Sequence, residues 1–430
     1  PAPLNRPLPP GNPTHAPERH PSRPPAAPAR RPGRRPAVTR SPQVALWPLL
    51  LGNFVIGTGV MAPAGLITEL TAAFAVDVAA VGSLIAWGGA LLCVQAPIVA
   101  FATSRLDRRI LLAGALLLFA AGHLASVCAG TFHALLAIRL VMIVAVACFT
   151  PQAASAVALF VPPERRAGAI AFIFLGWSLA SALGLPLVNL LGSLAGWRTP
   201  FVLLAAVGLL TALAVLATLP AGLKPHPLSP GAWFRALASR RIWRLLVVSG
   251  LLVAGQNLQY PYIVVLLQAR LAPDPPTTSA LLAVFGLASI LGTTLASRVV
   301  NRIGARRTAN GFLAVVLTGM SLWLTAPASV ALTVLALLVW GLGVSPSIAA
   351  QQARLVEANP AAASASVSLN TSIVYLGQAS GALAGGHLLV RGQTTVAATL
   401  TLALLALALG LSLVPRHRLR SGGGAAGHFH

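Results

Sequence analysis

Carboxylates are too few and too scattered for most enzyme chemistry. The chain of 430 residues holds only seven of them: Glu18, Glu69, Asp77, Asp107, Glu164, Asp274 and Glu357. General acid–base catalysis and metal binding usually need several such groups in one site. The sequence therefore disfavours a hydrolase or a metalloenzyme, and we expect no catalytic residues, no cofactor and no metal. A phosphate-binding Gly-x-x-x-x-Gly-Lys-Ser/Thr loop is also missing, which disfavours an ATP-driven pump.

Three titratable residues lie in or beside long apolar stretches and are candidates for moving a proton. Arg139 lies inside one stretch, where a charge is costly and usually faces a cavity or a partner. His123 lies inside another and titrates near neutral pH when unperturbed. Glu69 lies at the outer end of the first stretch. Each has a structural alternative, because Arg139 can extend to the membrane interface and a lone membrane histidine is more often simply packed.

Uncharged amides and phenols form a second group within the same stretches. The residues that we assign to a substrate pathway, together with Arg139, are Asn53, Gln152, Gln256, Asn257, Tyr260, Tyr262, Asn370 and Tyr375. Lipid solvates such groups poorly, so they must face protein or a central cavity. A lining of this kind suits a neutral or weakly amphipathic solute. Each residue taken alone can equally be a hydrogen bond between packed helices.

The elements that position these residues are expected to be membrane helices. The chain is 56% hydrophobic and only 9% charged, whereas soluble domains are about a quarter charged. Apolar stretches long enough to cross a bilayer as helices recur along it. We expect twelve, at residues 44–66, 79–101, 110–129, 133–160, 167–191, 201–219, 243–268, 278–300, 308–325, 330–351, 363–389 and 394–414.

The basic residues set the expected orientation. The net charge is +23, but 26 of the thirty Lys and Arg residues fall on one side of the expected membrane and three on the other. Basic residues are retained on the cytoplasmic side of membranes. We therefore expect both termini to be cytoplasmic in a bacterial inner membrane, and no nucleic-acid partner.

The helices divide into two sets of six. We expect a disordered Pro/Arg-rich tail at 1–43, a first bundle at 44–219, a cytoplasmic linker with a short interfacial helix at 220–242, a second bundle at 243–414 and a tail at 415–430. A basic turn after the second helix returns after the eighth, 194 residues later, with Asn301 in place of Asp107. The repeat indicates two related halves.

The two basic turns and two glycine-rich helices carry recognisable motifs. The turns contain Asp107, Arg108 and Arg109 in the first and Asn301, Arg302, Gly304, Arg306 and Arg307 in the second. Charge-assisted hydrogen bonds at such a turn can clamp two helix ends, and the alternative is that these arginines only anchor the helices. In the fifth helix Gly176, Gly184 and Pro186 predict close helix packing and a bend. The eleventh helix repeats the spacing around Gly377.

These motifs, in this order over roughly residues 44–414, resemble those of the major facilitator superfamily. Within it they are similar to the twelve-helix drug and sugar efflux branch, which includes arabinose-efflux-type permeases. The first turn resembles a shortened form of the superfamily's loop signature, and Arg139 matches the arginine of its helix-4 motif. The segment from Gly176 to Pro186 resembles the branch's antiporter motif.

The resemblance implies an all-α membrane protein of two pseudo-symmetric six-helix bundles that rock around a central site. It also implies a monomeric permease that exports a sugar-like compound or a drug by alternating access, in exchange for protons. One departure affects the coupling: the branch often has a glutamate in helix 1, and here Val60 stands in its place. An uncoupled facilitator or importer, a membrane enzyme, or a non-transporting sensor or scaffold are the alternatives.

Overall fold

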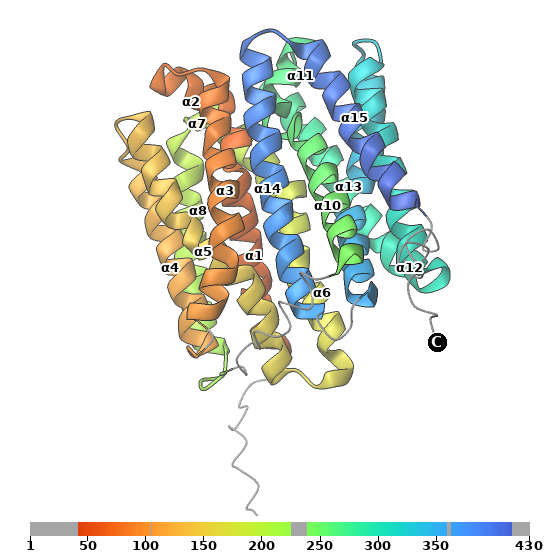
Figure 1. The fold of residues 1–430 in the computed structure, drawn as a ribbon. Coiled ribbons are helices and arrows are strands. Elements are labelled where there is room, and N and C mark those ends of the chain that lie inside the picture. The colour runs from red at the N-terminus through yellow and green to blue at the C-terminus, as the bar shows by residue number, and fades with distance from the viewer. Residues whose placement is uncertain (1–41, 104, 225–238, 359–362, 415–430) are drawn as a thin grey trace, which may run out of the picture. The chain divides into compact units, whose positions relative to one another are not determined.

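The computed structural model describes residues 42–103, 105–224, 239–358 and 363–414, and its regular elements over these residues are all helices. They run side by side between two ends (Figure 1). Twelve helical spans in this part of the chain are long and apolar enough to cross a membrane. The expected all-α fold with twelve membrane helices is confirmed.

The first six spans form what we call the N-half. Its elements are α1 (Pro42–Gly65), α2 (Ile67–Phe74), α3 (Val78–Ala102), α4 (Arg108–Val127), α5 (Phe132–Phe160), α6 (Pro163–Leu179), the π-helical turn η1 (Ala180–Gly184), α7 (Leu185–Ala195) and α8 (Arg198–Thr218). The segment α6–η1–α7 is one span, and its irregular turn precedes Pro186, which has no amide hydrogen to continue the regular ladder.

The last six spans form the C-half. Its elements are α10 (Arg240–Asn257), the 3₁₀ turn η2 (Tyr260–Tyr262), α11 (Ile263–Leu271), α12 (Pro275–Thr325), α13 (Val330–Ala358), α14 (Ala363–Val390) and α15 (Thr394–Leu413). The element α12 holds two spans, which join at Gly304 with a φ of 80°. Glycine adopts this left-handed conformation without steric cost, so the basic turn is a tight corner.

Several spans begin or end a few residues from the expected positions, and two of these differences affect residues discussed below. The first span ends at Gly65, and Glu69 lies on the separate short helix α2 rather than at the end of helix 1. The tenth span continues beyond Gln351 to Ala358. The two tails and the interfacial helix of the linker fall largely on residues 1–41, 225–238 and 415–430, which lie outside the described residues.

Several spans begin at a polar capping residue. The Asp77 carboxylate accepts a hydrogen bond from Ala80 N (2.7 Å) at the start of α3, and Asp274 does the same for Thr277 N (3.0 Å) at α12. A side chain in this position satisfies an amide that the helix leaves unpaired. Hydrogen bonds from the side chain and backbone of Thr277 lower the pKa of Asp274 below its usual range. The start of α12 is thus defined by its sequence.

Glycines bring helices into backbone contact within each half. A Cβ on Gly176 would overlap the Leu50 carbonyl of α1, and one on Gly184 would overlap the Thr58 side chain. In the C-half, a Cβ on Gly385 would overlap the Leu258 carbonyl at the end of α10. Small residues allow this approach in place of the hydrophobic effect, which does not drive association in lipid. The same device therefore joins the fifth span to the first and the eleventh to the seventh.

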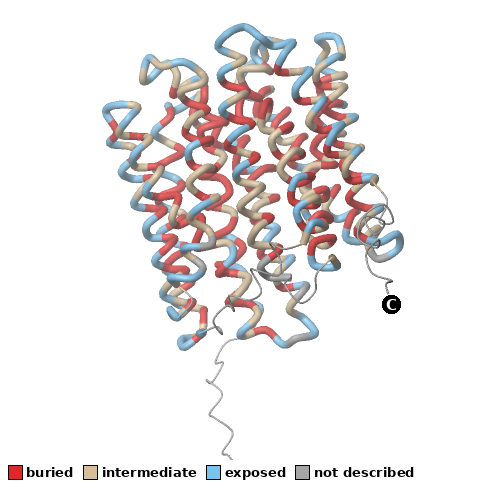
Figure 2. Tube along the Cα trace, viewed as in Figure 1, coloured by how far each residue is buried: buried red, intermediate tan, exposed pale blue. Residues whose placement is uncertain are grey.

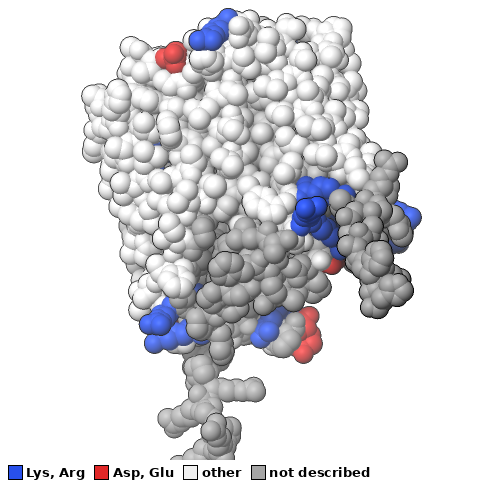
Figure 3. Space-filling view, in the orientation of Figure 1, with Lys and Arg blue, Asp and Glu red and all other residues white. Residues whose placement is uncertain are grey.

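Apart from the buried Arg139, the charged side chains of the described residues lie toward the two ends of the helices, and the face seen in Figure 3 is largely uncharged between them. The end that we call the basic end carries Arg105, Arg108, Arg109, Arg165, Arg166, Lys224, Arg240, Arg241, Arg244, Arg298, Arg302, Arg306, Arg307 and Arg354. The opposite end carries Arg198, Arg270 and Arg391. Buried positions run along the inner faces of the helices from one end to the other (Figure 2).

Candidate functional site

The N-half and the C-half meet where α12 crosses the fifth span. A Cβ added to Gly286 would overlap the backbone of Ala182 in η1. Nearer the opposite end, the Ser279 hydroxyl donates a hydrogen bond to Asn189 Oδ1 at 3.0 Å, and both residues are buried. This crossing therefore has no room for a side chain at Gly286 while the halves stay in contact.

Tyr260 and Tyr262, both in η2, also reach the N-half. The Tyr260 hydroxyl lies 3.7 Å from Met61 Sδ of α1, and the Ser181 side chain of η1 lies beside it. The Tyr262 hydroxyl donates to a backbone carbonyl of α14 and lies against Gly82 of α3. Both candidate pathway tyrosines are thus part of the interface between the halves.

These contacts lie toward the opposite end. Met61 is near the end of α1, Asn189 is near the end of α7, and Ser279 is near the start of α12. Closer to the middle, a Cβ on Gly89 of α3 would lie 3.0 Å from the Tyr375 carbonyl of α14. The contacts just described therefore close the interface on the side away from the basic end.

Arg139 is held inside the N-half and does not extend to the interface. Its side chain is only 4% exposed, and Nη2 donates to the Gly59 carbonyl of α1 at 3.1 Å. Nε and Nη1 are buried and have no hydrogen-bond partner among the described residues. Val60, which replaces the acid of the efflux branch, adjoins this carbonyl. Burying a guanidinium without a carboxylate partner lowers the stability of the fold. Packing alone therefore does not account for an arginine at this position.

His123 lies beside the same segment of α1. Its ring is fully buried, packs against Phe119 and Phe201 at centroid distances of 4.7 and 5.4 Å, and would contact any Cβ on Gly59. Both ring nitrogens lack a partner in the described part of the chain. His123 is close enough to Arg139 to interact with it electrostatically.

Two of the candidate pathway amides make hydrogen bonds within their own half. Asn53 Nδ2 donates to the Leu49 and Ile173 carbonyls at 3.2 and 3.1 Å, and its Oδ1 accepts from Thr150 at 2.9 Å. Gln256 Oε1 accepts from Trp340 Nε1 at 3.1 Å. These two amides tie helices together, which was the alternative interpretation of each residue.

Other candidates keep polar atoms that the described helices do not satisfy. Asn370 is fully buried, and neither of its amide atoms has a partner among the described residues. Gln152 is buried on α5, whereas Asn257 and Tyr375 are partly exposed. Asn257, Tyr375 and Tyr260 thus combine a polar group with access from outside the packed core.

Glu69 lies on α2 toward the opposite end. Its side chain is partly exposed, but Oε2 is buried and has no partner in the described structure. Burial raises the pKa of this carboxyl above its ordinary value of 4.5. Glu69 therefore stays protonated at a higher pH than an exposed glutamate does.

Each basic turn is fastened within its own half. Asp107 Oδ2 accepts from Gly222 N after α8 at 2.6 Å, and Oδ1 caps α4 through Arg109 N at 2.9 Å. In the C-half, Arg306 Nη2 donates to the Leu413 carbonyl at 2.8 Å. The turn after the second span thus binds the end of the sixth, and the turn after the eighth binds the end of the twelfth.

The remaining residues of these motifs are less constrained. Arg108 Nη1 donates to the Thr103 carbonyl at 2.8 Å, so it closes its own turn. Arg302 and Arg307 are exposed. The side chain of Asn301 lies outside the described residues.

Sequence reasoning missed a buried arginine in the C-half. Arg354 is 6% exposed, and its Nη1 donates to Gln351 Oε1 and to the Ser412 hydroxyl, both at 2.6 Å. Asn310 accepts from that same hydroxyl, so α12, α13 and α15 share one polar cluster. The spacing of Gln351 and Arg354, which puts both on one face of a helix, was the available signal.

Comparison with known proteins identifies the architecture. The family model described as Major Facilitator Superfamily matches residues 49–258 and again residues 245–427. A mutant of the peptide transporter POT in complex with sulfate is similar in structure, with a TM-score of 0.71 at 18% identity over 85% of this chain and 93% of that one. For a mutant of the nucleoside transporter NupG the values are 0.69, 13%, 86% and 100%. For the human organic anion transporter MFSD10 they are 0.64, 19%, 88% and 100%.

Proposed function

Because this chain belongs to the Major Facilitator Superfamily and is a membrane transporter, we propose that it exports a small organic solute, a sugar-like compound or a drug, in exchange for protons. The basic end faces the cytoplasm of a bacterial cell, since basic residues are retained on that side. The protein acts as a monomer, and both termini are cytoplasmic.

The closed contact between the halves carries this proposal. The halves touch at three places: Gly286 and Ala182 near the middle of their spans, and Ser279 with Asn189 and Tyr260 with Met61 toward the opposite end. Alternating access requires such a contact to open while the other side closes. An interface that is closed at the opposite end belongs to one of the two states that alternating access needs.

The chemistry near the middle of the helices supports an uncharged solute. Asn257, Tyr260 and Tyr375 carry amide and phenol groups on residues that are partly exposed as a whole. The described acids all lie in loops or near the ends of helices, at Glu69, Asp77, Asp107, Glu164, Asp274 and Glu357. A cationic solute would therefore find no counter-ion in the middle of the membrane.

Proton coupling is assigned to Glu69 rather than to His123 or Arg139. Glu69 has a raised pKa and a buried oxygen without a partner. His123 is fully buried between Phe119 and Phe201 inside a membrane helix, where placing a positive charge is costly. Arg139 has a positioning role in this proposal, because its hydrogen bond to the Gly59 carbonyl holds α1 beside α5.

Replacing Glu69 with glutamine is expected to uncouple solute flux from proton flux. Since the folded pKa is above 4.5, the native protein retains this proton over a pH range in which the unfolded chain releases it. The contribution of Glu69 to the free energy of unfolding therefore falls as pH rises through that window, and Glu69→Gln should remove this pH dependence of stability.

Coupling is measured separately. Internal pH is followed in proteoliposomes while labelled sugars and lipophilic drugs are added one at a time.

In this assay the wild-type protein should move protons when one compound of the panel is added. Glu69→Gln should still equilibrate that compound but move no protons, while Glu164→Gln, which alters an exposed acid at the basic end, should behave like the wild type. Proton movement that persists in Glu69→Gln would refute the assignment of the proton site.

An uncoupled facilitator is the second candidate. Val60 stands where the efflux branch often has an acid, and Arg139 has no carboxylate partner among the described residues. Labelled solute that equilibrates through the wild-type protein without any proton movement would establish this alternative and remove the exchange mechanism.

A further inference from the structure

A polar cavity lies at the basic end, within the C-half and apart from the interface between the halves. It encloses about 310 Å³ of space not filled by atoms, part of it open to solvent. The residues that line it are Arg241, Arg244, Leu245, Arg306, Arg354 and Glu357. Four guanidinium groups from three elements thus share one small cavity with a single carboxylate.

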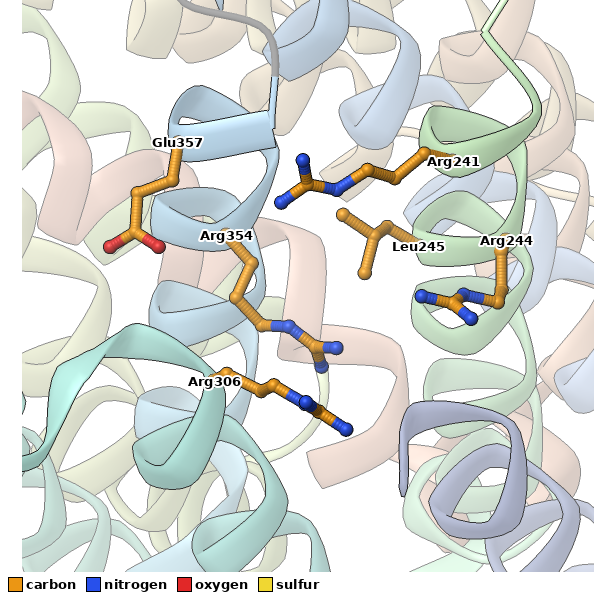
Figure 4. A pocket seen from close by; sticks show the side chains of 6 residues that line it. All are labelled: Arg241, Arg244, Leu245, Arg306, Arg354 and Glu357. Atoms are coloured by element: carbon orange, nitrogen blue, oxygen red, sulfur yellow. The ribbon is translucent and has the colours of Figure 1, made fainter. Parts of the chain in front are cut away.

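The side chains converge from two sides. Arg241 and Arg244 extend from α10, whereas Arg306 and Arg354 extend from α12 and α13 (Figure 4). In this view the Glu357 carboxylate points away from the guanidinium groups. The local charge facing the cavity is therefore strongly positive.

Two of the four arginines are held in place by the fold. Arg354 donates hydrogen bonds to Gln351 and Ser412, and Arg306 donates to the carbonyls of Leu413 and Val414. These four partners are neutral groups, and they orient the two guanidinium groups. A rigid donor set of this kind is preorganised for an anion.

Arg244 is the group whose bonding remains incomplete. Its Nε and Nη1 atoms are buried and have no hydrogen-bond partner among the described residues. A buried donor without a partner is destabilising, and a guanidinium beside three others is more so. An anion bound in the cavity would satisfy these donors and offset the repulsion.

We propose that this arginine pocket binds a phosphate group, either the headgroup of an anionic lipid or free phosphate. Guanidinium donors match phosphate oxygens in pairs. The pocket lies at the basic end, which is where lipid headgroups would be found. Occupancy would hold α10, α12 and α13 together on this side of the C-half.

Binding can be tested without knowledge of the transported solute. The probe is sodium phosphate against sodium chloride at equal ionic strength in a neutral detergent, and separately phosphatidylglycerol against phosphatidylcholine in mixed micelles. The readout is the thermal unfolding midpoint, followed through tryptophan fluorescence. We expect phosphate or phosphatidylglycerol to raise the midpoint by about 2 °C or more, saturably.

The variant Arg244→Gln should lose this shift, because Arg244 makes no hydrogen bond that the fold relies on through Nε or Nη1. Arg298→Gln removes an exposed charge at the same end and should keep the full shift. Arg244→Lys, which retains the charge without the planar donors, should keep only part of it and serves if Arg244→Gln is not monodisperse.

A shift with free phosphate in detergent would identify a soluble ligand, and a shift with phosphatidylglycerol alone would identify a lipid headgroup. No shift in either arm, or an equal loss of the shift in Arg244→Gln and Arg298→Gln, would overturn the proposal. These outcomes are independent of solute or proton flux, so failure of the exporter proposal would not be mistaken for failure of this one.

Discussion

Gly286→Ala is expected to lower solute flux by about tenfold or more. A methyl group at Gly286 would overlap the backbone of Ala182, which cannot move aside as a flexible side chain can. Overpacking of this kind costs about 1–3 kcal/mol. The cost applies only while the halves touch, so the substitution shifts the protein toward the state that is open at the opposite end.

Two measurements check this result. Flux is followed in proteoliposomes, and exposure of the contact is followed by labelling Ser279→Cys with a membrane-impermeant thiol reagent. Gly286→Ala should slow flux and speed labelling. Gly311→Ala is the matched control, because Gly311 is on the same element, α12, and nothing lies within 4 Å of an added Cβ. Normal flux and labelling in Gly286→Ala would show that the crossing does not open.

Arg139→Met is expected to separate stability from activity. The guanidinium makes one hydrogen bond, to the Gly59 carbonyl, while two of its nitrogens are buried without partners. Desolvation of such a group costs several kcal/mol, and one charged hydrogen bond returns only about 1.5–3 kcal/mol. An apolar side chain of similar length should therefore leave the thermal midpoint unchanged or raise it, while flux falls by about tenfold or more.

The comparison variants are Arg139→Lys and Arg391→Met. Lysine keeps the charge but not the planar donor set, so its flux should be intermediate. Arg391 is exposed at the opposite end, and its replacement should affect neither property. If Arg139→Met lowered the thermal midpoint and left flux per folded molecule unchanged, Arg139 would be a structural residue only.

Hydropathy was sufficient to predict the twelve membrane spans, because any long apolar helix is stable in lipid whatever its neighbours are. It failed where tertiary contacts decide. The end of the first span was predicted to within one residue, but the separate short helix α2, which carries Glu69, was not predicted. The tenth span extends past Gln351 because Arg354 finds partners on two other helices, which no local scale registers.

The sequence predicted which residues belong to the candidate site better than it predicted their contacts. Polar residues in the spans were identified from sequence, but only the structure separates Asn53, whose amide is fully used within the N-half, from Tyr260, which touches the other half. Thr150, the partner of Asn53 on α5, is 97 residues away in the chain, and Met61, which Tyr260 contacts, is 199 residues away. Contacts of that range follow from helix packing, which local patterns do not encode.

Reversible cross-linking between Asn189→Cys and Ser279→Cys tests whether solute passes between two halves that must separate at the opposite end. In a background without the native cysteines, a short reducible thiol cross-linker should abolish flux, and reduction should restore it. The control pair, Ala120→Cys and Gly208→Cys, lies within the N-half, where a Cβ on Gly208 would be 3.3 Å from that of Ala120. Cross-linking that pair should leave flux intact. Undiminished flux through protein cross-linked between residues 189 and 279 would contradict the account.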